Sequence, residues 1–152
     1  MALSVVPREQ FKLDEVKQSV MDEMRSLFAG RVDPEFFTFR RYTTPHPDIY
    51  ALLASQVGEP IPGWRIRLLS GDKIHTERRT RELRDLGLEI EVNERDDEST
   101  YCLVSLDADL RYGAAFQLRE NALRSKKVSG QVRSHYVEIA EQTAVLPQRK
   151  ST

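Results

Sequence analysis

The fold of this chain is decided by residues 63–84, which read GWRIRLLSGDKIHTERRTRELR. The pattern predicts a short amphipathic helix over residues 63–69, a break at residues 70–72 and a longer helix over residues 73–86. Gly87 is expected to end the second helix, because glycine readily adopts the left-handed conformation found just past a helix end. Two helices joined by a glycine-containing turn form the helix-turn-helix signature, whose second helix enters the DNA major groove.

The residues after the second helix predict a β-hairpin. Residues 88–92 alternate apolar and polar side chains, residues 93–99 read as a polar loop, and residues 100–106 form a second strand-like run. A helix-turn-helix followed by a two-stranded wing is a winged helix. We therefore predict an α+β fold, mostly α, in which amphipathic helices flank a winged helix-turn-helix on both sides.

Basic side chains concentrate in residues 63–84, although the whole chain has a formal charge of −1. Clustered Arg and Lys neutralise phosphates and release counterions, which supplies the sequence-independent part of DNA affinity. A helical wheel places Thr76, Thr80, Leu83, Leu86 and Gly87 on the buried side of the second helix, with Glu77, Arg78, Arg81 and Asp85 opposite. The predicted DNA contacts are Arg65, Lys73, His75, Thr76, Arg78, Arg79, Arg81 and Arg84.

The same charges have an alternative interpretation as a solvated helix face. The pairs Glu77–Arg81 and Arg78–Glu82 have i,i+4 spacing, and such pairs stabilise a helix without any ligand. His75, at the start of the second helix, either contacts a phosphate or base or caps the turn. The combination of helix-turn-helix and wing favours DNA binding over the solvated face.

Two motifs resemble those of a known family. Residues 58–66 read GEPIPGWRI, similar to G-x-P-V-x-G-x-x-L, and residues 78–87 read RRTRELRDLG, which matches R-R-x-R-E-L-R-x-x-G. Residues 49–106 thus resemble the winged-helix domain that precedes the nuclease domain in bacterial HNH-type restriction endonucleases. The resemblance implies a double-stranded DNA partner. Thr76 and Thr80 depart from it, since the family usually has larger apolar residues there.

The N-terminal flank contains one amphipathic helix and an aromatic connection. Residues 13–29 predict a helix, stopped by Gly30, whose apolar stripe either packs on the winged helix or forms a dimer seam. In residues 33–42 the phenylalanines either dock the connection on the core or stack on bases. Asp48 is the expected cap of a helix over residues 48–56. The stripe consists of Leu13, Val16, Val20, Met24, Leu27 and Phe28, and the phenylalanines are Phe36, Phe37 and Phe39.

The C-terminal flank predicts a helix from about residue 107 to Arg124. A break at residues 125–130 separates it from a further helix over residues 131–145. This flank has an excess of bases that could contact the DNA backbone beside the recognition helix: Arg111, Arg119, Arg124, Lys126, Lys127, Arg133, Arg149 and Lys150. The expected organisation is an arm and linker over residues 1–47, a winged helix-turn-helix domain over residues 48–106 and a helical extension over residues 107–152.

The predicted wing is acidic, which opposes DNA binding because carboxylates are repelled by phosphates. Either the wing points away from DNA, or the charged surfaces serve a protein partner. The acids are Glu89, Glu91, Glu94, Asp96, Asp97 and Glu98, and they surround one base, Arg95.

Enzyme motifs do not emerge from the sequence. His46, His75 and His135 are far apart, and neither a metal-ligand spacing nor a glycine-rich phosphate loop is present. The single cysteine, Cys102, is expected to be a small buried apolar residue. We therefore expect no catalytic site, no metal and no cofactor, unless the chain is a fragment of a nuclease.

The function predicted from these observations is binding of double-stranded DNA, with a homodimer if the target is a palindrome. The protein would act as a transcription regulator, or as a specificity module in restriction or antiviral defence, in a bacterium or phage. With no secretory signal or membrane-length apolar run, it is expected in the cytoplasm and away from membranes. The alternatives are a winged helix that binds proteins, or the DNA-recognition half of an HNH endonuclease.

Overall fold

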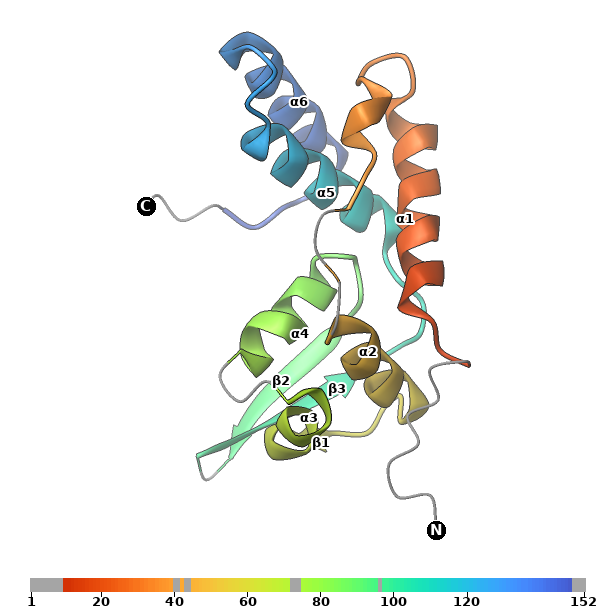
Figure 1. Cartoon of the computed structure of the whole chain (residues 1–152), viewed down its shortest axis with the longest axis vertical. Coiled ribbons are helices and arrows are strands. Elements are labelled where there is room, and N and C mark those ends of the chain that lie inside the picture. The colour runs from red at the N-terminus through yellow and green to blue at the C-terminus, as the bar shows by residue number, and fades with distance from the viewer. Residues whose placement is uncertain (1–9, 40–41, 43–44, 72–74, 96, 149–152) are drawn as a thin grey trace.

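The computed structural model describes residues 10–148, except for residues 40–41, 43–44, 72–74 and 96. The chain has an α+β architecture in which helix predominates (Figure 1). The helices are α1 (Leu13–Phe28), α2 (His46–Ser55), α3 (Gly63–Ser70), α4 (Thr76–Arg84), α5 (Leu110–Arg124) and α6 (Gly130–Thr143), with a 3₁₀ turn, η1 (Pro34–Phe36). The strands are β1 (Ile61–Pro62), β2 (Ile90–Arg95) and β3 (Glu98–Leu103).

Two groups of elements each enclose their own hydrophobic core. In the lower part of Figure 1, α2, α3 and α4 lie with the sheet, around a core that includes Ile49, Ile66 and Leu83. In the upper part, α1, α5 and α6 pack together around a core that includes Met24 and Leu118. The helices on the two flanks of the chain therefore pack against each other, although they are far apart in sequence.

The sheet has the strand order β1-β3-β2, and both pairings are antiparallel. The sequence did not predict β1, because a two-residue strand is too short to show alternation. The expected loop over residues 93–99 was wrong, since β2 continues to Arg95 and pairs there with Glu98 at the start of β3. The polar residues of this segment belong to the ends of two strands. In sequence, Asp96 and Asp97 separate β2 from β3.

Both helices predicted within residues 63–86 are present, as α3 and α4. Gly71 ends α3 and Gly87 follows α4, with φ of +70° and +99°, a region where glycine avoids the clash that a side chain would cause. Within the described residues α4 begins at Thr76, while Lys73 lies outside them. The expected Asp48 cap was wrong, because α2 already begins at His46 and Asp48 lies in its first turn.

The apolar stripe of α1 is covered by its own chain. Leu13, Val20, Met24 and Phe28 are buried, and α1 packs against both α5 and α2. The alternative in which this stripe forms a dimer seam is therefore wrong, since Val20 and Met24 have 0% exposure within a single chain.

The aromatic connection docks on the upper core. Phe36 and Phe37 are buried, and Phe39 is partly buried. The Phe36 ring meets the edge of the Tyr136 ring of α6 with 5.1 Å between ring centroids. The prediction that these phenylalanines anchor the connection is confirmed. On α6, Ile139 and Ala140 complete the same core.

The end of α4 and the start of α5 meet through direct backbone contact. The Asp109 N–H donates to the Gly87 carbonyl at 2.8 Å. Gly113, in the first turns of α5, faces the Leu86 carbonyl so closely that an added methyl group would overlap it, and the methyl would also lie 3.2 Å from Val20 Cγ2. This junction holds α4, α5 and α1 in one fixed arrangement.

We predict that Gly113→Ala lowers the free energy of unfolding by about 1–3 kcal/mol, because the new methyl overpacks a backbone contact that cannot move without shifting α4. Chemical denaturation followed by circular dichroism measures the change. Gly130→Ala is the matched control, since nothing lies within 4 Å of its added methyl. The control should be neutral or gain up to about 1 kcal/mol, as alanine favours helices. Equal effects of the two substitutions would contradict the packing argument.

Candidate nucleic-acid interface

The outer face of α4 carries two exposed arginines, Arg78 and Arg81. The opposite face packs into the lower core, where Thr80 and Leu83 have 0% exposure. The helical wheel is therefore confirmed for these positions. Thr76 is 5% exposed and faces inward, so its side chain is not available to a DNA ligand, and we remove it from the predicted contacts.

The other predicted contact residues surround α4 at lower exposure. His75 is half-buried and immediately precedes α4. Arg65, on α3, donates from Nη1 to Gln56 Oε1 at 3.3 Å. Arg84, in the last turn of α4, is half-buried, and its Nε is shielded from solvent without a hydrogen-bond partner among the described residues. Cations in the last turn of a helix also interact favourably with the helix dipole.

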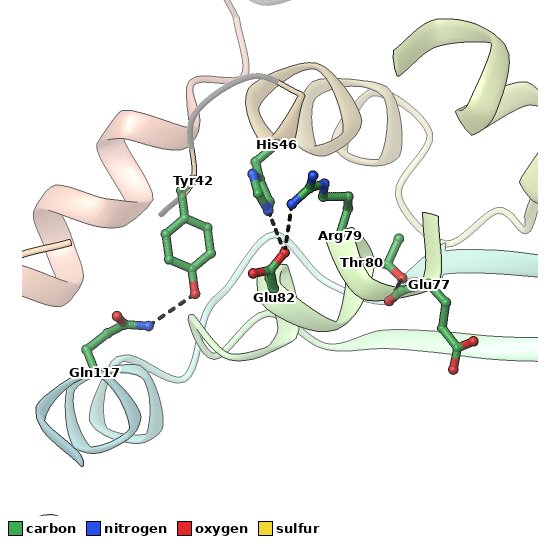
Figure 2. A network of polar contacts seen from close by, with 7 residues as sticks. All are labelled: Tyr42, His46, Glu77, Arg79, Thr80, Glu82 and Gln117. Atoms are coloured by element: carbon green, nitrogen blue, oxygen red, sulfur yellow. Dashed lines mark hydrogen bonds and ion pairs between the residues drawn. The ribbon is translucent and has the colours of Figure 1, made fainter. Parts of the chain in front are cut away.

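A buried carboxylate, Glu82, holds α4 against α2. Its Oε1 lies 3.2 Å from Nε2 of His46 and accepts a hydrogen bond from Nη1 of Arg79 at 3.3 Å (Figure 2). The side chains of Glu82 and His46 are 4% and 3% exposed. A carboxylate at this depth is tolerated only with partners, because removing it from water without them is costly. The expected Arg78–Glu82 surface pair is thus replaced by this internal contact.

The contact extends through the aromatic connection to α5. The Tyr42 ring meets the His46 ring edge-on, with centroids 5.2 Å apart, and the Tyr42 hydroxyl accepts a hydrogen bond from Gln117 Nε2 at 3.1 Å (Figure 2). A continuous set of side chains therefore joins α5, α2 and α4. Sequence patterns do not reveal this set, because His46 and Glu82 are 36 residues apart.

Asp85, directly after α4, has its pKa raised from 3.8 to about 7. Burial is the main cause, and the carboxylates of Glu120 and Glu82 add to it, while Arg81 and Arg84 act in the opposite direction. Its position at the negative end of the helix dipole also disfavours the ionised form. Near neutral pH this carboxyl is therefore only partly ionised.

The acidic residues of the hairpin do not all face α4. Side chains alternate across a strand, so Glu91 lies on the sheet face opposite to Ile90 and Val92. Ile90 packs in the same core as Leu83 of α4. Glu91 thus belongs to the face of the sheet that points away from α4, and Glu89 shares that face.

Glu98 contacts α3 rather than open solvent. Its Oε1 lies 3.4 Å from Nη2 of Arg67 and accepts the Trp64 N–H at 3.1 Å, at the first turn of the helix. A carboxylate is favourable there because of the helix dipole. Of the described hairpin acids, Glu94 and Asp97 are the ones left exposed near the turn.

The described residues contain no group of three or more His, Cys, Asp or Glu that could hold a metal ion. Cys102 is buried, and burial raises the pKa of its thiol. Among the helices that the structure describes, none is both long and apolar enough to cross a bilayer.

Comparison with known proteins gives one match. A family model described as the KpnI N-terminal domain matches residues 47–104, which links this part of the chain to the N-terminal region of a restriction endonuclease. The match runs from α2 to the end of β3 and leaves out α1, α5 and α6. No curated protein and no solved structure shows a significant match.

We predict that Asp85→Asn stabilises the protein at pH 8 but not at pH 4. A folded-state pKa near 7, above the ordinary 3.8, means that the folded chain binds this proton more tightly than the unfolded chain. Stability is therefore lost as pH rises from about 4 to about 7, and asparagine avoids the loss. We expect a gain of about 1–3 kcal/mol at pH 8.

Denaturant unfolding at both pH values measures this gain. Asp22→Asn, on the exposed face of α1, is the control and should show the same small effect at both pH values. A gain for Asp85→Asn that does not grow with pH would show that the carboxyl is ionised without penalty.

Proposed function

We propose that residues 46–103 form a winged helix-turn-helix that binds double-stranded DNA through α4. The observation that carries the proposal is the pair of exposed arginines, Arg78 and Arg81, on the second helix of a helix-turn-helix whose other face is packed in the core. The element order α2-β1-α3-α4-β2-β3 supports it, because the hairpin directly follows the second helix as a wing does. The match to the KpnI N-terminal domain covers the same residues.

In the proposed complex α4 lies in the major groove. Arg78 and Arg81 are separated by a rise of about 4.5 Å along the helix, which suits contacts to neighbouring nucleotides. Arg79 is held by Glu82 at the edge of this face, so its guanidinium is positioned before DNA arrives. His75 and Arg84 mark the two ends of the contact surface, and Arg65 adds a base from α3.

The geometry of the hairpin reduces the expected repulsion between its carboxylates and the phosphates of a DNA bound at α4. Glu89 and Glu91 lie on the sheet face away from α4, and Glu98 is neutralised by Arg67 and the start of α3. Repulsion from carboxylates falls with distance and is screened by salt beyond about 10 Å. The wing in this proposal stays outside the groove and supports α3.

The role that best fits the family match is that of a specificity module in restriction or antiviral defence, with transcription regulation as the runner-up. We infer that the module acts where its DNA is, in the cytoplasm of a bacterium or on phage DNA. In this role the module would direct an HNH-type nuclease domain to its DNA site. A homodimer on a palindromic site would need a surface other than the α1 stripe, which the chain itself covers.

A second candidate function is binding of a protein partner through α3. Trp64 and Leu68 are 53% and 77% exposed, and they lie one helical turn apart on the same face. Exposed apolar pairs of this kind are typical of protein interfaces. DNA binding through α4 leaves these residues free, so the two activities are separable by mutation.

The double charge reversal Arg78→Glu with Arg81→Glu should abolish binding to labelled random duplex DNA, measured by fluorescence anisotropy at two salt concentrations. Loss of a single base-contacting arginine costs about 1–3 kcal/mol, and reversal adds repulsion from phosphates. Both side chains are exposed, so helicity by circular dichroism should not change. The control Lys12→Glu with Arg25→Glu makes the same change of net charge at two exposed residues, one just before α1 and one on it, and should retain most binding. Wild-type affinity in the α4 variant would reject the groove assignment.

We further propose that the chain itself cuts no nucleic acid. Nucleases need carboxylate or histidine ligands that converge on the scissile phosphate and a base to activate water. Supercoiled plasmid incubated with the protein and magnesium, manganese or zinc should stay intact, while a duplex probe shows a salt-sensitive band shift. Nicking that disappears in Asp96→Asn or Glu98→Gln would instead identify a hidden active site in the hairpin.

A further inference from the structure

The connection between α5 and α6, which we call the basic turn (residues 125–129), presents two exposed lysines, Lys126 and Lys127. Arg124 precedes it and Arg133 follows it. An open hollow of about 410 Å³ lies beside it, lined in part by Thr38, Arg124, Ser125, Lys126 and Lys127, with Glu35 as the acid on its rim. Both lysines are exposed to solvent at the edge of this hollow.

The basic turn is held in place from several sides. Arg133 donates from Nη2 to the Ser125 carbonyl at 2.8 Å, and the Lys127 N–H donates to Ser125 Oγ at 3.3 Å. Val128 packs against the upper core. Asn121, one turn earlier on α5, donates to the carbonyls of Phe36 and Thr38 at 2.8 and 2.9 Å. The lysines therefore project from a fixed base, which reduces the entropy lost when they bind an anion.

Helix α5 sets the distance between the basic turn and α4. At Gly113 it contacts Leu86, just past the end of α4, and the helix from Gly113 to Arg124 corresponds to about 17 Å. In Figure 1 the far end of the α5–α6 hairpin and α4 both lie on the left of the molecule, while α1 lies on the right. A duplex turns once in about 34 Å, so about 17 Å corresponds to about five base pairs.

We propose that the basic turn is a second phosphate-binding site, which contacts the backbone of the duplex about five base pairs from the groove that α4 occupies. The site rests on the proposed DNA binding of α4 and extends its footprint. The occupant has the chemistry of two adjacent backbone phosphates, because Lys126 and Lys127 are point cations without a fork geometry that would read a base. The turn thus increases the affinity for DNA and fixes the orientation of the protein on the duplex, but it adds no sequence preference.

The test is the variant Lys126→Ala with Lys127→Ala, assayed on random DNA hairpins with stems of about 5 and about 20 base pairs. The shorter stem is filled by the groove that α4 occupies and cannot reach the basic turn. Affinity for the long stem should fall by up to about 60-fold at 0.1 M salt, about eightfold for each lost phosphate contact. The slope of log affinity against log salt should shrink by about 1.8. Affinity for the short stem should change less than threefold. The control Lys12→Ala with Arg25→Ala removes two exposed charges, one just before α1 and one on it.

The outcomes separate the two proposals. If the unmodified protein binds the long stem and the lysine variant has the same affinity and salt slope, the basic turn is not a phosphate site, while α4 binding stands. Equal losses on both stems, or equal losses in the α1 control, also overturn the site, because they show a general charge effect. Absence of DNA binding by the unmodified protein overturns both proposals. Both lysines are exposed, so unchanged thermal unfolding is expected in every variant.

Discussion

The contact between the backbone of residues 86–87, just past α4, and the start of α5 is the constraint on which the rest of the structure depends. Gly87 turns the chain with a φ of +99°, and Gly113 lets α5 approach the Leu86 carbonyl with no side chain between them. Val20 of α1 closes the same junction from the other side. The lower and upper cores are therefore joined by backbone at van der Waals distance rather than by a flexible linker. Any ligand bound at α4 meets a surface whose position relative to α5 and α6 is fixed.

Two carboxyl groups on the inner side of α4, Glu82 and Asp85, add little to the stability of the fold but help to fix the position of the helix. Glu82 is deeply buried and has two partners, His46 and Arg79, so its desolvation is at least partly offset. Asp85 is buried beside two other carboxylates, and its pKa of about 7 means that the fold is less stable when it is ionised. Neither group is an efficient way to stabilise a domain. Their joint effect is to fix how α4 lies on α2 and α5, which is the requirement for a helix that presents arginines to a ligand.

The sequence predicted those features that depend on neighbouring residues. The amphipathic period and two glycines located α3, α4 and the face that carries Arg78 and Arg81. Features that depend on distant residues were missed. Glu82 was interpreted as a possible surface partner of Arg78, since its burial depends on His46 in another helix. Polar side chains in β2 and β3 were read as a loop because one face of this hairpin is solvated. The cover of the α1 stripe lies mainly on α5, which follows much later in the chain.

The formal charge of −1 hides a separation of charge that bears on how a duplex would approach. Exposed Arg78 and Arg81 lie on α4, whereas Glu89 and Glu91 lie on the sheet face turned away from it. Under the proposed function, a duplex near the sheet face is repelled and one near α4 is attracted, so encounter is steered to a single orientation. Glu89 and Glu91 then do not compete with DNA binding. They lower the affinity of wrong orientations, which raises the specificity of a module that must present one helix to one groove.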